Sequence, residues 1–357
     1  MKVHRLRIFT ACLLSIMLMA GCSSNSASNT PLEQPPAEEV VVPEETESTE
    51  ELSAYRAALT GLPIEEESTV RPLAVMINNA PAARPQSGLT EADVIYEVLA
   101  EGGITRLVAI FQSNNTDIAI GPIRSIRPYL IDIGDSYSGI LVHAGGSPAA
   151  YGILQKQKKA DMDEIGNAGS YFWRESSRKA PHNLYSSVQK LREGADKLGY
   201  SIETELPLMT FREPEEVVIG DEAKKIDVQF LLQSYKVTYE YDEESKLYNR
   251  FMNDEAHIDL NTNEQLKAAN VVVLGADHKV LDDVGRLSVD LTTGGDALLF
   301  QRGKVLEGRW IHKADDIIRF VVDNEEIPLF PGTTYYNIVP NTPDFKSHVI
   351  IDGGAEG

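Results

Sequence analysis

Cysteine is almost absent from the 357-residue sequence, which holds only Cys12 and Cys22. Both lie at the start of the chain, so no thiol is available after position 22. This absence excludes a disulfide framework, a zinc–thiolate site and a cysteine nucleophile from the folded part. We therefore expect the folded part to be stabilised by its hydrophobic core.

Positive charge is scarce as well. The chain has 33 Lys and Arg against 54 Asp and Glu, which gives a formal net charge of -21. Binding to nucleic acid requires an excess of Lys and Arg on the binding face to neutralise the phosphates, so we expect no nucleic-acid partner. Attraction to anionic lipid is excluded for the same reason, so a membrane partner would need a different anchor.

Long apolar runs are missing except for one at the N-terminus, residues 8–20, which follows Lys2, Arg5 and Arg7. As a helix this run would extend only about 20 Å, against about 30 Å of bilayer hydrocarbon, so a transmembrane anchor is excluded by length. Small residues then precede Cys22. The pattern predicts a lipoprotein signal peptide over residues 1–22, with lipid (palmitate) on Cys22 and the mature protein at the extracytoplasmic face of the cell membrane.

The next segment, residues 23–54, is predicted to be a disordered acidic tether. It has eight glutamates between residues 23 and 53, no Lys or Arg, and few large apolar side chains. Such a composition cannot bury enough apolar surface to offset the loss of conformational entropy on folding.

The hydrophobic pattern predicts an α/β N-terminal subdomain over residues 55–215. Val- and Ile-rich runs favour strands, and capping residues mark two helices. The expected strands are 73–78, 94–99, 107–112 and 140–143, and the expected helices are 148–158 and 184–198, the second with Gly199 as its C-terminal cap.

A β-rich (α+β) C-terminal subdomain is predicted over residues 216–345, as a sandwich or a strongly curved sheet, followed by a tail over 346–357. A hairpin is expected around Arg302-Gly303, with Trp310 in the core. Residues 331–336 predict a turn into a late strand, with an aromatic side chain that faces carbohydrate as an alternative. The expected strands are 236–241, 247–252, 271–274, 286–291, 297–302, 305–311, 317–322 and 335–339.

The segment ILVHAGGSPA at residues 140–149 is the most suggestive chemically. A strand enters Gly145-Gly146, Ser147 follows, and Pro148 opens a helix. Ser147 is expected to cap this helix. Free backbone N–H groups at the same place would favour an anion. A nucleophilic role for Ser147 is a weaker alternative, because the segment lacks the G-x-S-x-G pattern.

Two histidines in such loops are candidate acid–base groups. His143 ends the strand before the glycines, and His182 lies in a second loop, RKAPHN, together with Arg178 and Asn183. Residues of these types bind phosphate or carboxylate, or transfer protons. A metal held by both histidines and Glu97 or Glu101 is an alternative, but no short ligand spacing supports it, so we expect no metal and no cofactor.

Arginines also gather in Gly- and Pro-containing segments of the N-terminal half, where they are candidate ligand-binding residues. The alternative is an arginine network with Glu97 and Glu101 that holds the loops in place. The arginines are Arg84, Arg106, Arg124, Arg127, Arg174 and Arg178.

Several of these segments together resemble the YerB-like family of bacterial lipoproteins. The segments are LAVMINNAPAARPQSGL, EGGITR, GPIRSIRP, HAGGSPAA, APHNLY, GKVLEGRW and PGTTYYNIVP, in this order. The resemblance spans about residues 70–340. It implies a lipid-anchored extracytoplasmic protein with a two-part domain of unknown function, and it implies no activity.

Two hypotheses follow from the sequence. In the first, an arginine-rich cleft binds an anionic ligand, such as a cell-wall polymer fragment or a small molecule. In the second, the protein is an envelope hydrolase or transferase that uses His143 and His182 as acid–base groups, with the arginines stabilising charge. Convergence of the histidines and Gly145-Gly146 on one pocket would favour the enzyme.

Overall fold

The computed structural model describes residues 55–114, 116–231 and 236–352. The predicted signal peptide with Cys22, the predicted tether and residues 353–357 lie outside the described residues. In the described ranges, no helix has the length and apolarity that crossing a membrane requires.

The helices lie in the N-terminal part of the described chain, between residues 128 and 197. They are α1 (Pro128–Asp135), α2 (Pro148–Gln157) and α3 (Val188–Lys197). Short 3-10 helices occupy Pro81–Ala83, Leu89–Glu91, Glu101–Gly103, Gly169–Tyr171 and Phe345–His348. The N-terminal part is therefore α/β and the C-terminal part β-rich, as the sequence predicts.

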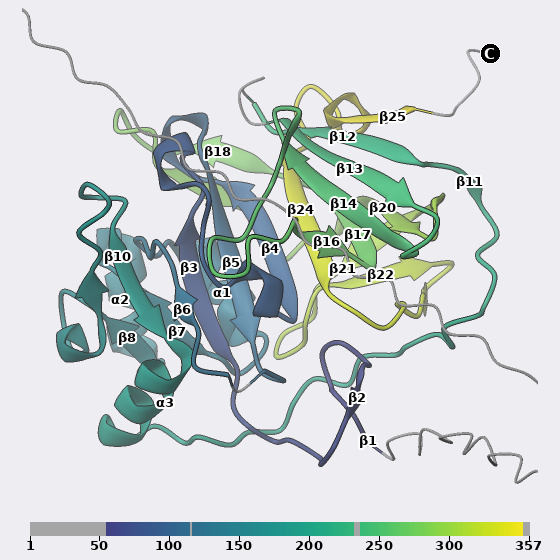
Figure 1. Cartoon of the computed structure of the whole chain (residues 1–357). Helices are drawn as coiled ribbons and strands as arrows, with labels where there is room; N and C mark the ends of the chain where they lie inside the picture. Colours follow the sequence, from purple (N-terminus) through teal and green to yellow (C-terminus); the bar gives the residue numbers. More distant parts are fainter. Residues whose placement is uncertain (1–54, 115, 232–235, 353–357) are drawn as a thin grey trace, which may run out of the picture. The chain divides into compact units, whose positions relative to one another are not determined.

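A 12-stranded mixed sheet runs through both parts (Figure 1). Its strands, in spatial order, are β23 (Glu325–Glu326), β22 (Arg319–Val322), β21 (Lys304–Ile311), β20 (Gly295–Gln301), β17 (Asn270–Ala276), β24 (Thr334–Pro340), β4 (Val94–Leu99), β5 (Thr105–Phe111), β3 (Leu73–Asn78), β7 (Ile140–His143) and β8 (Asp161–Asp163), with β11 (Asp221–Glu222) paired to β21.

Smaller sheets complete the architecture. The six-stranded sheet holds β15 (Glu255–Ala256), β14 (Leu247–Met252), β13 (Lys236–Asp242), β12 (Lys225–Gln229) and β25 (Val349–Asp352), with β16 (Lys267–Ala268) paired to β14. The others are β6 (Ala119–Ile120) with β10 (Leu184–Ser187) and β9 (Trp173–Arg174), β1 (Tyr55–Arg56) with β2 (Pro63–Ile64), and β18 (His278–Val280) with β19 (Leu287–Val289).

Strand β24 connects the two parts, because it pairs in parallel with β4 on one side and β17 on the other. The sequence did not indicate this junction: β17 and β20 to β24 extend the N-terminal sheet, whereas β12 to β16 and β25 form the second, six-stranded sheet. Part of the predicted tail is also structured, since residues 349–352 form β25 and pair with β12. The predicted boundary near residue 215 stays a prediction.

The central strands β3, β4 and β5 are buried along their whole length. Burial on both faces explains why their sequences are nearly continuous apolar runs without a two-residue alternation. Trp310 is fully buried, as predicted, and its indole N–H donates to the carbonyl of Gly275 at 2.8 Å. The predicted hairpin is confirmed: Arg302 and Gly303 have φ of 51° and 71°, as a two-residue type I′ turn requires.

Helix predictions are confirmed for α2 and corrected for α3. Ser147 caps α2 by accepting a hydrogen bond from the N–H of Ala150. The helix predicted over 184–198 begins four residues later, because residues 184–187 form β10 and Ser187 caps α3 through the N–H of Lys190. Gly199 follows with φ of 77°, the left-handed conformation expected after a helix.

Candidate functional site

A cavity of about 420 Å³ lies where the glycines after β7 meet the segment before α1. The two segments are in register: the N–H of Ala144 donates to the carbonyl of Arg124 at 3.1 Å, and the N–H of Ile126 to that of Gly145 at 3.0 Å. We call this space the Arg124 cavity. Its lining residues are Ile123, Arg124, Ser125, Ala144, Gly145, Gly146, Tyr151, Glu164, Ile165, Arg174, Pro181 and Leu184.

Two predicted features therefore meet in one cavity, the Gly145-Gly146 turn and Arg124. Gly145 has φ of 72°, which disfavours other residues, and Asp163 accepts a hydrogen bond from its N–H at 2.7 Å. The amide of Gly145 is thus already bonded, so Gly145 contributes close backbone approach rather than a free donor.

Arg124 is the cation of this cavity that has no partner. In the part of the chain that the structure describes, its guanidinium makes no hydrogen bond or ion pair, and its Nε is buried. Burial, followed by the positive charge of Arg127, lowers its pKa. A half-buried guanidinium without a carboxylate can gain charge-assisted hydrogen bonds only from a ligand or from water.

The second arginine of the cavity, Arg174, is held by protein partners. It forms an ion pair with Glu164 at 3.1 Å and donates to Oδ1 of Asn183 at 3.2 Å. Asn183, predicted as a ligand-binding residue, therefore positions Arg174 and does not line the cavity. Sequence reasoning missed Glu164 and Tyr151, and the only signal for Tyr151 was its place in the first turn of α2 after the glycines.

His182 borders the Arg124 cavity through its neighbour Pro181. Its Nδ1 lies 2.8 Å from Nδ2 of Asn78, so it accepts a hydrogen bond from that amide. Burial, then the charges of Arg124 and Arg178, lower the pKa of His182. The imidazole is therefore neutral at pH 7.

His143 does not line the cavity. Its side chain is fully buried, Nδ1 donates to the carbonyl of Gly145 at 3.0 Å, and Nε2 lies 3.3 Å from Asp161. His143 and His182 therefore do not converge on one pocket, which is the arrangement that would favour the enzyme hypothesis; His143 instead bonds the glycine turn. Glu97 and Glu101 also contact arginines and not these histidines, which removes the alternative metal site. Among the described residues, no group of three or more His, Cys, Asp or Glu side chains could hold a metal ion.

The remaining predicted ligand-binding residues have structural partners outside the cavity. Ser147 caps α2. Arg178 donates to the carbonyls of Ala83 and Pro85 at 2.8 and 2.5 Å. Arg84 donates to the carbonyl of Asn79 and lines another cavity, next to His257.

Arg106 and Arg127 lie close enough to Arg124 to affect its charge, but they do not line the cavity. Arg106 is buried, donates to the carbonyl of Ser125 at 2.5 Å, and has an Nε without a partner. Burial, then Arg127 and Arg124, lower its pKa to about 10. Arg127 forms an ion pair with Glu101, as the alternative of a Glu–Arg network predicts. The three guanidinium groups together make this region positive in an otherwise acidic chain.

Glu97 has a partner that the sequence did not indicate. It forms a fully buried ion pair with Arg250 of β14. The Arg250 guanidinium also lies 5.0 Å from the centre of the Tyr335 ring and donates to Nδ1 of His257 at 3.0 Å. This polar cluster joins β4 to the six-stranded sheet, and both side chains of its ion pair are fully buried.

Comparison with known proteins gives consistent results. Residues 59–201 match the family described as "Protein of unknown function (DUF3048) N-terminal domain", and residues 226–336 match the corresponding C-terminal domain. The chain is 37% identical over 289 residues to "Putative lipoprotein YerB" of Bacillus subtilis (strain 168), covering 80% of this chain and 86% of that protein. The crystal structure of the YerB protein from Bacillus subtilis superposes with a TM-score of 0.76 at 36% identity, covering 84% of this chain and 99% of that one.

Proposed function

The chain belongs to the DUF3048 family of unknown function and is similar to the Bacillus subtilis protein named "Putative lipoprotein YerB". From this we propose that it is a lipid-anchored extracytoplasmic protein that binds an anionic envelope ligand in the Arg124 cavity. Cys22 carries the lipid in this proposal, after removal of residues 1–21. Labelling of cells with a palmitate analogue should mark the wild-type protein and not the Cys22→Ser variant.

One observation carries the binding proposal: Arg124 faces a cavity with a guanidinium that no group of the described chain satisfies. Arg174 adds a second guanidinium to the same cavity, and His182 adds a neutral imidazole beside it. Phosphate and carboxylate oxygens are the ligand groups that match two guanidinium groups. The cavity volume of about 420 Å³ lies within the range of small-molecule sites.

The enzyme hypothesis finds less support. An acid–base pair would need both histidines within reach of one bound group, and the buried His143, bonded to a backbone carbonyl, does not provide this. Binding without chemistry is therefore the function that we propose.

Calorimetric titration of the full chain in detergent micelles tests the proposal. The probes are inorganic phosphate, adenosine diphosphate and a tripeptide with a free carboxylate, which represent the anionic groups that the cavity would accept. At least one should bind the wild-type protein, and Arg124→Gln should weaken that binding by about 10- to 100-fold, as expected for lost charge-assisted hydrogen bonds.

Arg309→Gln is the matched control, because Arg309 is exposed on β21 and paired with Asp296 at 3.1 Å. This variant should bind like the wild type. Absence of binding for all three probes, or equal affinity in Arg124→Gln, would contradict the proposed function.

A further inference from the structure

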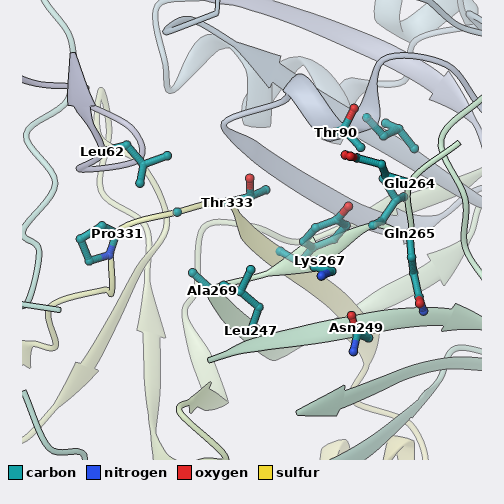
Figure 2. Close-up of a pocket in the computed structure, with 14 residues that line it drawn as sticks. Leu62, Thr90, Leu247, Asn249, Glu264, Gln265, Lys267, Ala269, Pro331 and Thr333 are labelled. Carbon is teal, nitrogen blue, oxygen red and sulfur yellow. The ribbon is translucent and has the colours of Figure 1, made fainter. Parts of the chain in front are cut away.

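A second cavity, of about 650 Å³, lies beside β14, β16 and β24 and shares no lining residue with the Arg124 cavity (Figure 2). We call it the Tyr335 cavity. Figure 2 shows Leu62 and Pro331 at one side of it and Thr90 and Glu264 at the other, with Asn249 on a strand. The proposed function makes no use of it.

Uncharged polar groups without partners line this cavity. Tyr335 is only 1% exposed, and in the described ranges its hydroxyl makes no hydrogen bond. The side-chain amide of Asn249 is likewise without one there. Gln265 donates through Nε2 to the carbonyl of Arg250 at 2.9 Å, which leaves its own amide oxygen for another donor. A hydroxyl that no protein group bonds can gain hydrogen bonds from a ligand in the cavity, so a hydroxylated ligand is favoured here.

Apolar side chains form the remaining wall. Leu62, Leu247 and Pro331 carry no polar side-chain group, and Leu62 is 46% exposed. A surface that combines aliphatic carbon with hydroxyl and amide groups matches a sugar ring, whose C–H faces are apolar and whose edges carry hydroxyls.

The charge of the cavity is balanced. Glu264 and Lys267 are its ionised residues, one of each sign. A phosphate or carboxylate ligand would meet as much repulsion as attraction, in contrast to the Arg124 cavity. The ligand class is therefore uncharged.

Strand pairing disfavours a peptide. A peptide that adds to a sheet needs a strand with a free edge. Among the described strands of this wall, β24 pairs with β17 and β4, and β14 pairs with β13 on one side and with β15 and β16 on the other. Neither of these strands offers a free edge for a main-chain ladder, and β16, whose one pairing among the described strands is with β14, is only two residues long.

We propose that the Tyr335 cavity binds an uncharged saccharide residue, with the Tyr335 hydroxyl and the Asn249 amide bonding its hydroxyl groups. Its volume lies within the 300–1,000 Å³ that is typical of small-ligand sites. The site is independent of the anion site proposed above.

Titration of the full chain in detergent micelles with N,N′-diacetylchitobiose and with maltose tests this, with saturation-transfer NMR and calorimetry as readouts. At least one disaccharide should bind. Tyr335→Phe, which removes only the unbonded hydroxyl, should weaken binding by about 3- to 10-fold, and Asn249→Ala should weaken it similarly.

Tyr336→Phe is the matched control. Tyr336 is the next residue of β24 and is equally buried, but it stacks on Tyr96 and does not line the cavity. Its variant should bind like the wild type, and so should Arg124→Gln, which separates this site from the anion site. Failure of both disaccharides to bind, unchanged affinity in Tyr335→Phe, or binding of a dialanine peptide instead would overturn the proposal.

Discussion

At the scale of single residues, the arginines that look alike in the sequence differ in their partners. Arg178 is satisfied by two carbonyls that lie 93 and 95 positions away in the chain, and Arg127 by Glu101. Arg124 has no such partner among the described residues. Residue type and Gly/Pro context predicted Arg124, Gly145 and Gly146 as site residues, but they could not separate Arg124 from Arg178, because the distinguishing contacts are long-range.

His257 gives a residue-scale prediction about pH. It is buried, Nδ1 accepts from Arg250 and Nε2 donates to Gln86 at 2.7 Å, and burial followed by Arg250 and Arg84 holds its pKa well below the usual value. In the unfolded chain His257 takes up a proton as the pH falls below about 6.5, whereas in the folded chain it does not. Stability is therefore lost on acidification.

The contribution of His257 to this loss should be about 2 kcal/mol between pH 7 and pH 5. Urea denaturation at both pH values measures it. In His257→Gln the difference between the two free energies of unfolding should be smaller by that amount, even if the variant is less stable at both. An unchanged difference would mean that His257 is protonated in the folded protein.

At the scale of elements, strands were predicted better than helices. The apolar runs of β3, β4 and β7 gave correct bounds, because buried central strands are recognisable from composition. Helix α1 was missed because its eight residues are too few to show a helical period, and four of them, Tyr129, Leu130, Ile131 and Ile133, are buried. The start of α3 was placed too early because only the cap at Ser187 marks it.

Ser147 caps helix α2, and its hydroxyl was also predicted to bind a ligand. Replacing Ser147 by Ala removes the cap and should lower the free energy of unfolding by about 1 kcal/mol. Ser187→Ala, at the start of α3, should have a similar effect. Anion affinity in the Arg124 cavity should be unchanged in both variants, as calorimetry would show; a selective loss of binding in Ser147→Ala would make Ser147 a ligand-binding residue.

At the scale of the whole molecule, the sequence predicted an α/β part followed by a β-rich part but not their common sheet. Parallel pairing of β24 with β4 joins Thr334 to Val94, and no local pattern can encode a contact over such a separation. The Glu97–Arg250 ion pair crosses the same junction. The sequence could not indicate this ion pair, because other arginines lie nearer to Glu97 along the chain than Arg250 does.

The buried Glu97–Arg250 pair should be essential for this junction. Arg250→Met leaves a buried carboxylate without its cation and should lower the free energy of unfolding by about 3–5 kcal/mol. The double variant Glu97→Gln, Arg250→Met should recover part of this loss, and Arg309→Met, at an exposed position, should change little. Urea denaturation followed by circular dichroism checks this series; a small effect of Arg250→Met would contradict the assigned role.

The central claim, that Arg124 binds an anion, is tested most directly by NMR of arginine Nε–H groups in the full chain in detergent micelles, during separate titrations with inorganic phosphate, adenosine diphosphate and the tripeptide. The Arg124 signal is assigned by its absence in Arg124→Gln. We predict that this signal shifts and that the shift saturates, because the anion would bond the Arg124 guanidinium, which makes no hydrogen bond or ion pair with the described residues, while the signal of Arg309 stays constant. An Arg124 signal that moves with none of the three probes up to millimolar concentration, or shifts of equal size at Arg124 and Arg309, would contradict the claim.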